Sequence, residues 1–225
     1  MTERFVAIIP ALNAERTVSR VIEQARQHIE PVVVIDDGST DRTGEVARAA
    51  GAIVLTHELN RGKGGALKTG FAWAREHGYD GVITLDADGQ HLPSEIPKFL
   101  RERLAGGEDL IIGGRSHLFG QMLPRRRNAN RFSAWCIAKC SGVPITDSQS
   151  GFRFYSAKLI DGITLRTDGF DMESEVIVRA GRRGFRIVTI PIELGFVDGL
   201  STSHYKPLKD TLRIAWTVTR ARLFW

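Results

Sequence analysis

Short apolar runs alternate with longer segments of mixed apolar and polar residues through the first half of the chain. The runs are rich in β-branched residues, as in Val32-Val33-Val34-Ile35, which is typical of strands buried on both faces. The longer segments have the spacing of amphipathic helices. This pattern predicts strands at residues 5–9, 32–35, 53–55, 82–85 and 110–112, separated by helices at 14–28, 41–50, 64–77 and 94–104. Such alternation indicates an α/β fold with a mainly parallel sheet flanked by helices.

The second half of the chain is less regular. Its pattern predicts strands at residues 152–155, 186–190 and 192–196, and helices at 128–140, 173–181 and 206–225. The sequence has no internal repeat, low-complexity tract or linker-like composition, so we expect residues 1–225 to form a single domain.

Composition narrows the class of protein. A chain of 225 residues with 42% hydrophobic residues can bury a sizeable core without disulfides. No run reaches the ~18 apolar residues of a membrane-spanning helix, and the N-terminus lacks a signal-peptide pattern, so we expect a cytoplasmic protein. Cys136 and Cys140 have no partners at metal-ligand spacing, and we interpret them as ordinary intracellular thiols.

The positive charge of the chain is unevenly distributed. The net charge is +5, and basic residues gather at Arg115, at residues 125–127 and at Arg131. Such a cluster suits phosphates, nucleic acid or an anionic membrane surface, with a solvated surface as the alternative. Because no aromatic residues are interleaved in the basic run, we expect no nucleic-acid partner.

Polar residues follow three of the predicted parallel strands. The segments are Pro10-Ala11-Leu12-Asn13-Ala14-Glu15, Asp36-Asp37-Gly38-Ser39-Thr40-Asp41 and Asp86-Ala87-Asp88-Gly89-Gln90. Because the carboxyl ends of parallel strands share one edge of the sheet, we expect these segments to converge on one crevice. A carboxylate there can accept hydrogen bonds from a nucleobase or a ribose. A turn with a helix cap at Ser39 or Asp41 is the alternative for the second segment, but capping explains only one of its acids, so we favour a binding role for Asp37.

Asp86 and Asp88 are two residues apart at the end of an apolar strand. In an extended segment such residues point to the same side, so the two carboxylates would repel each other. A hard divalent cation removes this conflict, because it prefers oxygen ligands and is commonly held by a few carboxylates together with substrate phosphates. Gln90 offers one further oxygen. The sequence therefore predicts a site for Mg²⁺ or Mn²⁺ on a diphosphate.

A glycine-rich loop, Asn60-Arg61-Gly62-Lys63-Gly64-Gly65, precedes a predicted helix. It matches neither a dinucleotide-binding fingerprint nor a P-loop. The loop could let the backbone approach a nucleotide, with Lys63 near the phosphates, and an ordinary glycine turn is the alternative.

Taken together, these motifs resemble family 2 glycosyltransferases of the GT-A fold, in the branch of dolichol-phosphate mannose synthases and other polyprenyl-phosphate glycosyltransferases. The resemblance spans roughly residues 5–206. It rests on the three strand-end segments, on the loop from Asn60, and on Gln149-Ser150-Gly151-Phe152-Arg153, in this order. It implies a nucleotide-sugar half at about 1–114 and an acceptor half at about 115–206, and the pattern of residues 207–225 itself predicts an amphipathic C-terminal helix.

The resemblance also implies roles for individual residues. The donor nucleotide would be held by Pro10, Ala11, Asn13, Glu15, Asp37, Ser39, Lys63 and Asp86. The metal, Mg²⁺ or Mn²⁺, would be held by Asp86, Asp88 and Gln90, with Asp88 as a catalytic residue. The acceptor phosphate would be held by Arg115, Arg127, Ser150 and Arg153. Arginine forks suit phosphate oxygens.

The implied reaction is an inverting transfer of a sugar from a nucleoside-diphosphate sugar to a polyprenyl phosphate. A lipid phosphate is already ionised at pH 7, whereas a sugar hydroxyl would need a general base. Asp147 is the candidate base by its position before Gln149, and an acid of a turn or helix cap is the alternative. A soluble family 2 enzyme that glycosylates a hydroxyl group is the alternative, and a nucleotide-sugar-binding protein without turnover is disfavoured by the intact set of acids and arginines. The Q-x-x-R-W motif of processive synthases is absent.

Two features depart from the family pattern. Many relatives carry C-terminal transmembrane helices, whereas residues 208–225 here combine bulky apolar side chains with four basic residues. This helix is expected either to lie in an anionic membrane interface, which would make the protein peripheral at the cytoplasmic face, or to pack on the domain. The second departure is Ser203-His204-Tyr205, where some relatives carry a basic residue near the donor phosphates.

Overall fold

A seven-stranded sheet forms the centre of the molecule, for which the computed structural model describes residues 3–117, 124–195 and 207–223. Its strand order is β3-β2-β1-β4-β6-β5-β7. The strands are β1 (Phe5–Ala11), β2 (Val32–Asp36), β3 (Ile53–Thr56), β4 (Gly81–Thr84), β5 (Leu110–Gly114), β6 (Arg153–Ser156) and β7 (Ile187–Pro191). Only β6 runs antiparallel to its neighbours, β4 and β5, while the other pairs are parallel. The predicted mainly parallel sheet is confirmed.

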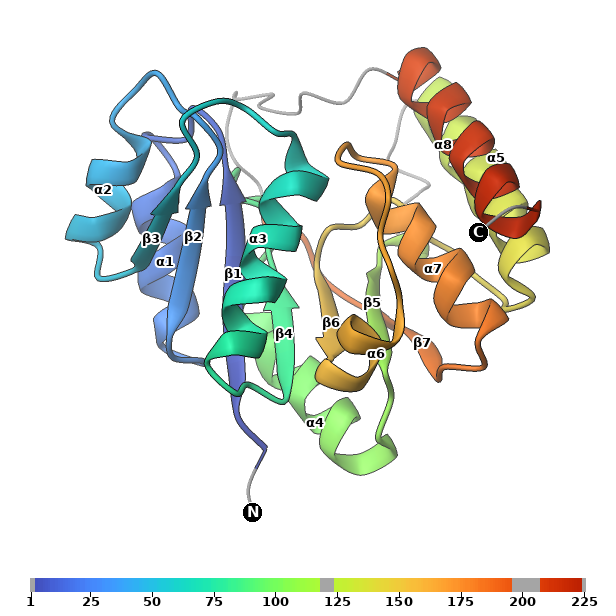
Figure 1. Cartoon of the computed structure of the whole chain (residues 1–225), viewed down its shortest axis with the longest axis horizontal. Helices are drawn as coiled ribbons and strands as arrows, with labels where there is room; N and C mark the ends of the chain where they lie inside the picture. Colours follow the sequence, from blue (N-terminus) through green and yellow to red (C-terminus); the bar gives the residue numbers. More distant parts are fainter. Residues whose placement is uncertain (1–2, 118–123, 196–206, 224–225) are drawn as a thin grey trace.

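Helices cover both faces of this sheet (Figure 1). Three of them pack on one face: α1 (Val18–Arg26), α2 (Thr43–Ala49) and α4 (Ile96–Gly106), which follows the short 3₁₀ turn η1 (Pro93–Glu95). The opposite face is covered by α3 (Lys63–Glu76), α6 (Ala157–Gly162) and α7 (Met172–Arg182), and α5 (Pro124–Ser141) and α8 (Pro207–Leu223) pack against α7. Alternate residues of each strand enter the two cores, as Ile8 and Ile9 of β1 do.

The second half of the chain differs from the sequence prediction in two places. The strand predicted at 192–196 is wrong, because over the described residues 192–195 only Leu194 pairs, through an isolated bridge to His91. Ile192 is buried in the core, which explains the apolar signal. The short helix α6 was not predicted. The side chain of Ser156 caps it by accepting a hydrogen bond from the Leu159 backbone N–H at 3.1 Å.

The last helix packs on the domain while leaving part of its surface exposed. In α8, Ile214, Val218 and Ala221 are buried, whereas Trp216 and Leu223 are exposed. The helix lies beside α5, at the end of the molecule opposite β3 (Figure 1). Across the described part of the chain, no helix combines the length and apolar character needed to span a membrane. His204 and the side chains of Arg125 and Arg126 lie outside the described residues.

Candidate functional site

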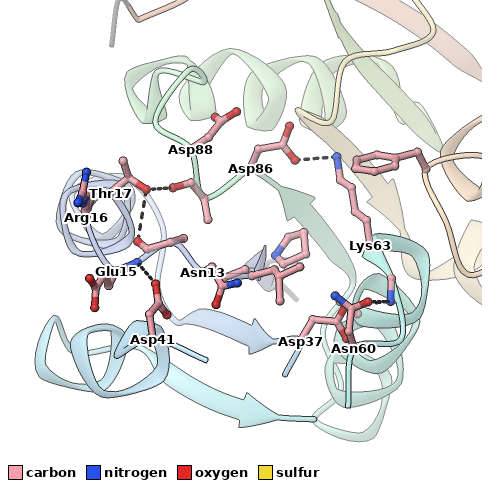
Figure 2. A pocket seen from close by; sticks show the side chains of 18 residues that line it. Asn13, Glu15, Arg16, Thr17, Asp37, Asp41, Asn60, Lys63, Asp86 and Asp88 are labelled. Atoms are coloured by element: carbon pink, nitrogen blue, oxygen red, sulfur yellow. Dashed lines mark hydrogen bonds and ion pairs between the residues drawn. The ribbon is translucent and has the colours of Figure 1, made fainter. Parts of the chain in front are cut away.

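A cavity of about 560 Å³ lies at the carboxyl ends of β1, β2 and β4. The three polar segments that follow these strands meet there with the start of α3 and with Phe170 (Figure 2). Of the predicted site residues, the cavity is lined by Pro10, Ala11, Asn13, Glu15, Asp37, Lys63, Asp86 and Asp88. The sequence prediction that these residues converge on one crevice agrees with this arrangement. Ser39, Gln90, Arg115, Arg127, Asp147, Ser150 and Arg153 are not among the lining residues.

The loops after β1 and β2 are joined to each other by their own polar groups. Asn13 has a positive φ of 51°, and its side-chain oxygen accepts hydrogen bonds from the backbone N–H of Thr40 at 2.9 Å and from the Thr40 hydroxyl. The Ser39 hydroxyl accepts a hydrogen bond from the backbone N–H of Asn13 at 3.0 Å. The Glu15 N–H in turn donates to Asp41. Asn13 and Ser39 therefore have a structural part in shaping this wall of the cavity.

Asp37 anchors the glycine-rich loop to the sheet. Its buried carboxylate accepts hydrogen bonds from the backbone N–H groups of Arg61 and Gly62, both at 2.9 Å, and from Nδ1 of His57 at 2.6 Å. The other ring nitrogen of His57 lies 2.9 Å from the Thr69 hydroxyl in α3. His57 was missed by the sequence reasoning, because no local motif marks it as a partner of an aspartate 20 residues earlier.

Lys63 connects the two halves of the chain at the cavity. Its ammonium nitrogen lies 2.6 Å from Oδ1 of Asp86 and 3.2 Å from Oε2 of Glu173 in α7 (Figure 2 shows the first contact). Burial acts to raise the pKa of Asp86, but the positive charge of Lys63 outweighs it and lowers that pKa to about 2. Asp86 is thus ionised and already paired. Glu173 was not predicted from the sequence.

The pKa of Asp88 is shifted in the opposite direction, upward. Burial and the adjacent charge of Asp86 raise its pKa, although its Oδ1 accepts a hydrogen bond from the Gln90 backbone N–H at 2.9 Å. Two carboxylates that line one cavity and repel each other are a donor set that suits a hard divalent cation. Among the described residues, no cluster of three or more His, Cys, Asp or Glu side chains forms a metal site. Asp86 and Asp88 would therefore hold a cation together with oxygen atoms from a ligand.

His91 supports the backbone of this acidic segment. Its Nδ1 accepts a hydrogen bond from the Asp86 backbone N–H at 3.1 Å, so this nitrogen carries no proton. Burial lowers the pKa of His91 to about 4, although the charge of Asp86 acts in the opposite direction. The ring is 3% exposed and lies against Phe152, with 5.3 Å between the ring centroids. A neutral imidazole thus fixes the strand end that presents Asp86.

Arg115 and Asp147 form a buried ion pair beyond the cavity lining. Nε of Arg115 lies 2.8 Å from Oδ2 of Asp147, Nη2 lies 3.2 Å from Oδ1, and the Arg115 backbone N–H also donates to Oδ2. Burial acts to raise the pKa of Asp147, but the positive charge of Arg115 outweighs it and lowers that pKa. A carboxylate with both oxygens engaged and a lowered pKa is poorly suited to accept a proton. The geometry therefore does not favour the predicted role of Asp147 as a base.

Ser150 and Arg153 also differ from their predicted roles. The guanidinium of Arg153 is fully buried and donates to the carbonyl oxygens of Ser148, Ser150 and Glu173, each at 2.7 Å. Ser150 is buried, and its hydroxyl accepts a hydrogen bond from the Phe152 N–H. These two residues stabilise the turn beside the cavity, and the structure shows neither in a position to contact an acceptor phosphate. Arg127 in α5 is half-buried, and its Nε has no hydrogen-bond partner among the described residues.

With this geometry established, comparison with known proteins defines the class: the chain belongs to glycosyl transferase family 2, whose pattern it matches over residues 6–164. It is 33% identical over 202 residues to the undecaprenyl-phosphate mannosyltransferase of Micrococcus luteus, covering 84% of this chain and 82% of that protein. It is 29% identical over 214 residues to the UDP-N-acetylglucosamine–dolichyl-phosphate N-acetylglucosaminyltransferase of Methanococcus voltae, covering 85% of each.

The fold has a counterpart among solved structures. Glucosyl-3-phosphoglycerate synthase from Mycobacterium tuberculosis, in complex with Mn²⁺, UDP and phosphoglyceric acid, is similar with a TM-score of 0.72 at 20% identity, covering 97% of this chain and 77% of that chain. The fold is therefore the GT-A glycosyltransferase fold that the sequence motifs imply.

Proposed function

We propose that this protein transfers a sugar from a nucleoside-diphosphate sugar to a polyprenyl phosphate, with inversion at the anomeric carbon. The observation that carries the proposal is the cavity in which Asp37, Lys63, Asp86 and Asp88 come together, in a chain whose relatives are named as sugar transferases to undecaprenyl and dolichyl phosphate. The names of those relatives specify different sugars, N-acetylglucosamine in one and mannose in the other. The similarity therefore supports a lipid-phosphate acceptor more strongly than it supports any one donor.

In this proposal the donor occupies the cavity. The segment from Pro10 to Glu15 and the buried Asp37 form the wall against which the nucleoside lies. Asp86 and Asp88 would hold Mg²⁺ or Mn²⁺ on the diphosphate, with Gln90 close in sequence. When bound, this cation supplies Lewis-acid stabilisation of the negative charge on the leaving diphosphate. Lys63, at the first residue of α3, contacts Asp86 at 2.6 Å and therefore lies next to the proposed cation site.

The acceptor reacts as an anion. A phosphate oxygen forms a bond to the anomeric carbon while the bond from that carbon to the diphosphate oxygen breaks, and the nucleoside diphosphate leaves. Because the phosphate is already ionised at neutral pH, no side chain has to remove a proton. The engagement of Asp147 by Arg115 supports this reading, since a hydroxyl acceptor would need a free base. Arg127 remains a proposed contact for the acceptor phosphate, whereas Arg115 would first have to release Asp147.

A donor screen tests the proposal. The purified protein is incubated with undecaprenyl phosphate in detergent and with each of a panel of UDP- and GDP-sugars, in the presence of Mg²⁺ or Mn²⁺ or with EDTA. We expect one donor class to give a lipid-linked sugar in the metal-containing samples, with the anomeric configuration opposite to that of the donor. Failure of every donor in the panel to give a lipid-linked product would contradict the proposal.

A further inference from the structure

The contacts of Lys63 create a competition at the cavity. The ammonium group lies 2.6 Å from an Asp86 oxygen, and the side chain of Lys63 is only 14% exposed. A divalent cation bound by Asp86 would come within a few ångströms of this ammonium group, where repulsion between like charges is strong. Lys63 and a cation therefore compete for the same carboxylate.

The packing around Lys63 limits where its ammonium group can go. A side chain at Gly151 would place its Cβ 2.5 Å from the Lys63 nitrogen and 2.8 Å from both Asp86 oxygens, so the ion pair is pressed against the Gly151 backbone. The ring of Phe170 lies 6.0 Å from the nitrogen on another side. Among the described residues, the second ion-pair partner of this ammonium group is the carboxylate of Glu173, 3.2 Å away.

Glu173 has the properties of an alternative partner. Its side chain is 7% exposed, and its Oε1 is buried with no hydrogen-bond partner among the described residues, while Oε2 contacts Lys63. A buried carboxylate oxygen without a hydrogen-bond partner is energetically costly, so the carboxylate is stabilised when an ammonium group moves closer and bonds to both oxygens. The position is held firmly, because the Glu173 carbonyl oxygen accepts a hydrogen bond from the buried Arg153.

We infer that Glu173 is a positioning residue that receives Lys63 when a divalent cation binds to Asp86. The inference rests on the proposed metal role of Asp86 and Asp88. In the absence of a cation, the positive charge of Lys63 neutralises Asp86 and reduces the repulsion between Asp86 and Asp88. When a cation binds, the ammonium group moves fully onto Glu173, which lies in the half of the chain proposed to bind the acceptor.

Mn²⁺ binding to the whole protein tests this inference without reference to turnover. The concentration of free Mn²⁺ is followed by electron paramagnetic resonance at a fixed concentration of UDP, which supplies the diphosphate oxygens, during titration of the wild type and of the variants E173Q, K63M and K63M/E173Q, and Mn²⁺ bound by UDP alone is subtracted. We expect E173Q to raise the Kd for Mn²⁺ about tenfold, because Lys63 then stays on Asp86. We expect K63M to lower the Kd, and the double variant to bind as K63M does. Lys68 in the same helix pairs with the exposed Asp168 at 2.8 Å, so K68M is the matched control for loss of one positive charge and should change the Kd little.

The alternatives give different results. If Glu173 were itself a ligand of the cation, E173Q would weaken Mn²⁺ binding equally in the K63M background, which would overturn the inference. An unchanged Kd in E173Q, or a raised Kd in K63M, would also overturn it. D88N separates this failure from failure of the proposed metal site: if the wild type binds Mn²⁺ no better than D88N does, the metal role of the acidic segment itself is wrong.

Discussion

At the scale of single residues, the site depends on acids whose charges are balanced in different ways. Asp86 is paired with Lys63, whereas Asp88 has a raised pKa and no ion pair among the described contacts. Asp88 is therefore the carboxylate that gains most from a cation. This difference separates two residues that the sequence pattern alone treats as equivalent.

We expect D88N to abolish sugar transfer and D86N to weaken it severely. The change from carboxylate to amide removes a negative charge that a divalent cation requires, while the shape of the side chain is kept. The measurement is transfer to undecaprenyl phosphate over a range of Mn²⁺ concentrations. The metal role is refuted by a variant that keeps full activity in EDTA-treated buffer.

His91 is expected to make the stability of the protein depend on pH. The pKa of His91 is lowered to about 4 in the folded protein, from the ordinary histidine value of 6.5. As pH falls below about 6.5 the unfolded chain binds a proton that folded His91 does not, so the free energy of unfolding should decrease until about pH 4, by roughly 3 kcal/mol. H91N keeps an acceptor for the Asp86 N–H and should remove this component.

Urea unfolding in EDTA at several pH values between 4 and 7 measures the effect. The quantity of interest is the difference in pH dependence between the wild type and H91N, because other groups contribute equally to both. Identical slopes for the two proteins would show that His91 titrates normally in the folded state.

At the scale of elements, the loop before α3 is shaped by a contact that lies outside the cavity. His57 does not line the cavity, yet its Nδ1 is hydrogen-bonded to the carboxylate of Asp37. The same carboxylate accepts hydrogen bonds from the backbone N–H groups of Arg61 and Gly62. We expect H57A to weaken binding of the donor nucleotide about tenfold, because Asp37 and the loop lose a charge-assisted hydrogen bond. The measurement is nucleotide affinity by isothermal titration calorimetry.

His77 offers a matched control for this substitution. It lies in an exposed position at the C-terminal end of α3, where its Nδ1 lies 2.8 Å from the Trp73 carbonyl oxygen and its ring stacks on Trp73. H77A should leave nucleotide affinity unchanged. Equal affinities for H57A and the wild type would show that the loop keeps its shape without His57.

Part of the fold and of the site could be predicted from the sequence alone. Continuous apolar runs predicted the strands of the first half, and the acidic segments at their ends predicted where the cavity lies. The antiparallel insertion of β6 between β4 and β5 has no local signal, because strand pairing depends on distant residues. Glu173 was missed for the same reason, since it meets Lys63 only through the fold. Asp147 was predicted as a candidate base from its position just before Gln149, and its buried pairing with Arg115, which disfavours that role, has no signal in the sequence.

At the scale of the whole molecule, charge and exposed aromatic residues gather on two adjacent helices. Helices α5 and α8 together contain nine basic residues and one acid, so they carry more positive charge than the +5 of the whole chain. On the same pair of helices the side chains of Phe132, Trp135, Trp216 and Leu223 are exposed. This combination suits an anionic membrane interface, where a lipid acceptor would be found.

We expect the double variant W135S/W216S to lose most of its binding to anionic liposomes, because the aromatic side chains would enter the interface. Co-sedimentation with phosphatidylglycerol vesicles at low and high salt measures this, and binding of the wild type should weaken as salt is raised. The control is L104S, since Leu104 is equally exposed but lies on α4. The membrane role is refuted if the wild type does not co-sediment at low salt, or if the control and the double variant lose binding alike.

In the proposed reaction the acceptor is a phosphate carried by a polyprenyl lipid. The most direct test compares transfer of a radiolabelled sugar to undecaprenyl phosphate and to undecaprenol, with the same donor, metal and detergent. These acceptors differ only in the ionised group that the proposed reaction uses as its nucleophile. We predict a labelled lipid product with the phosphate and none with the alcohol. Equal labelling of both lipids, or labelling only of a soluble hydroxyl acceptor, would show that the phosphate is not the nucleophile.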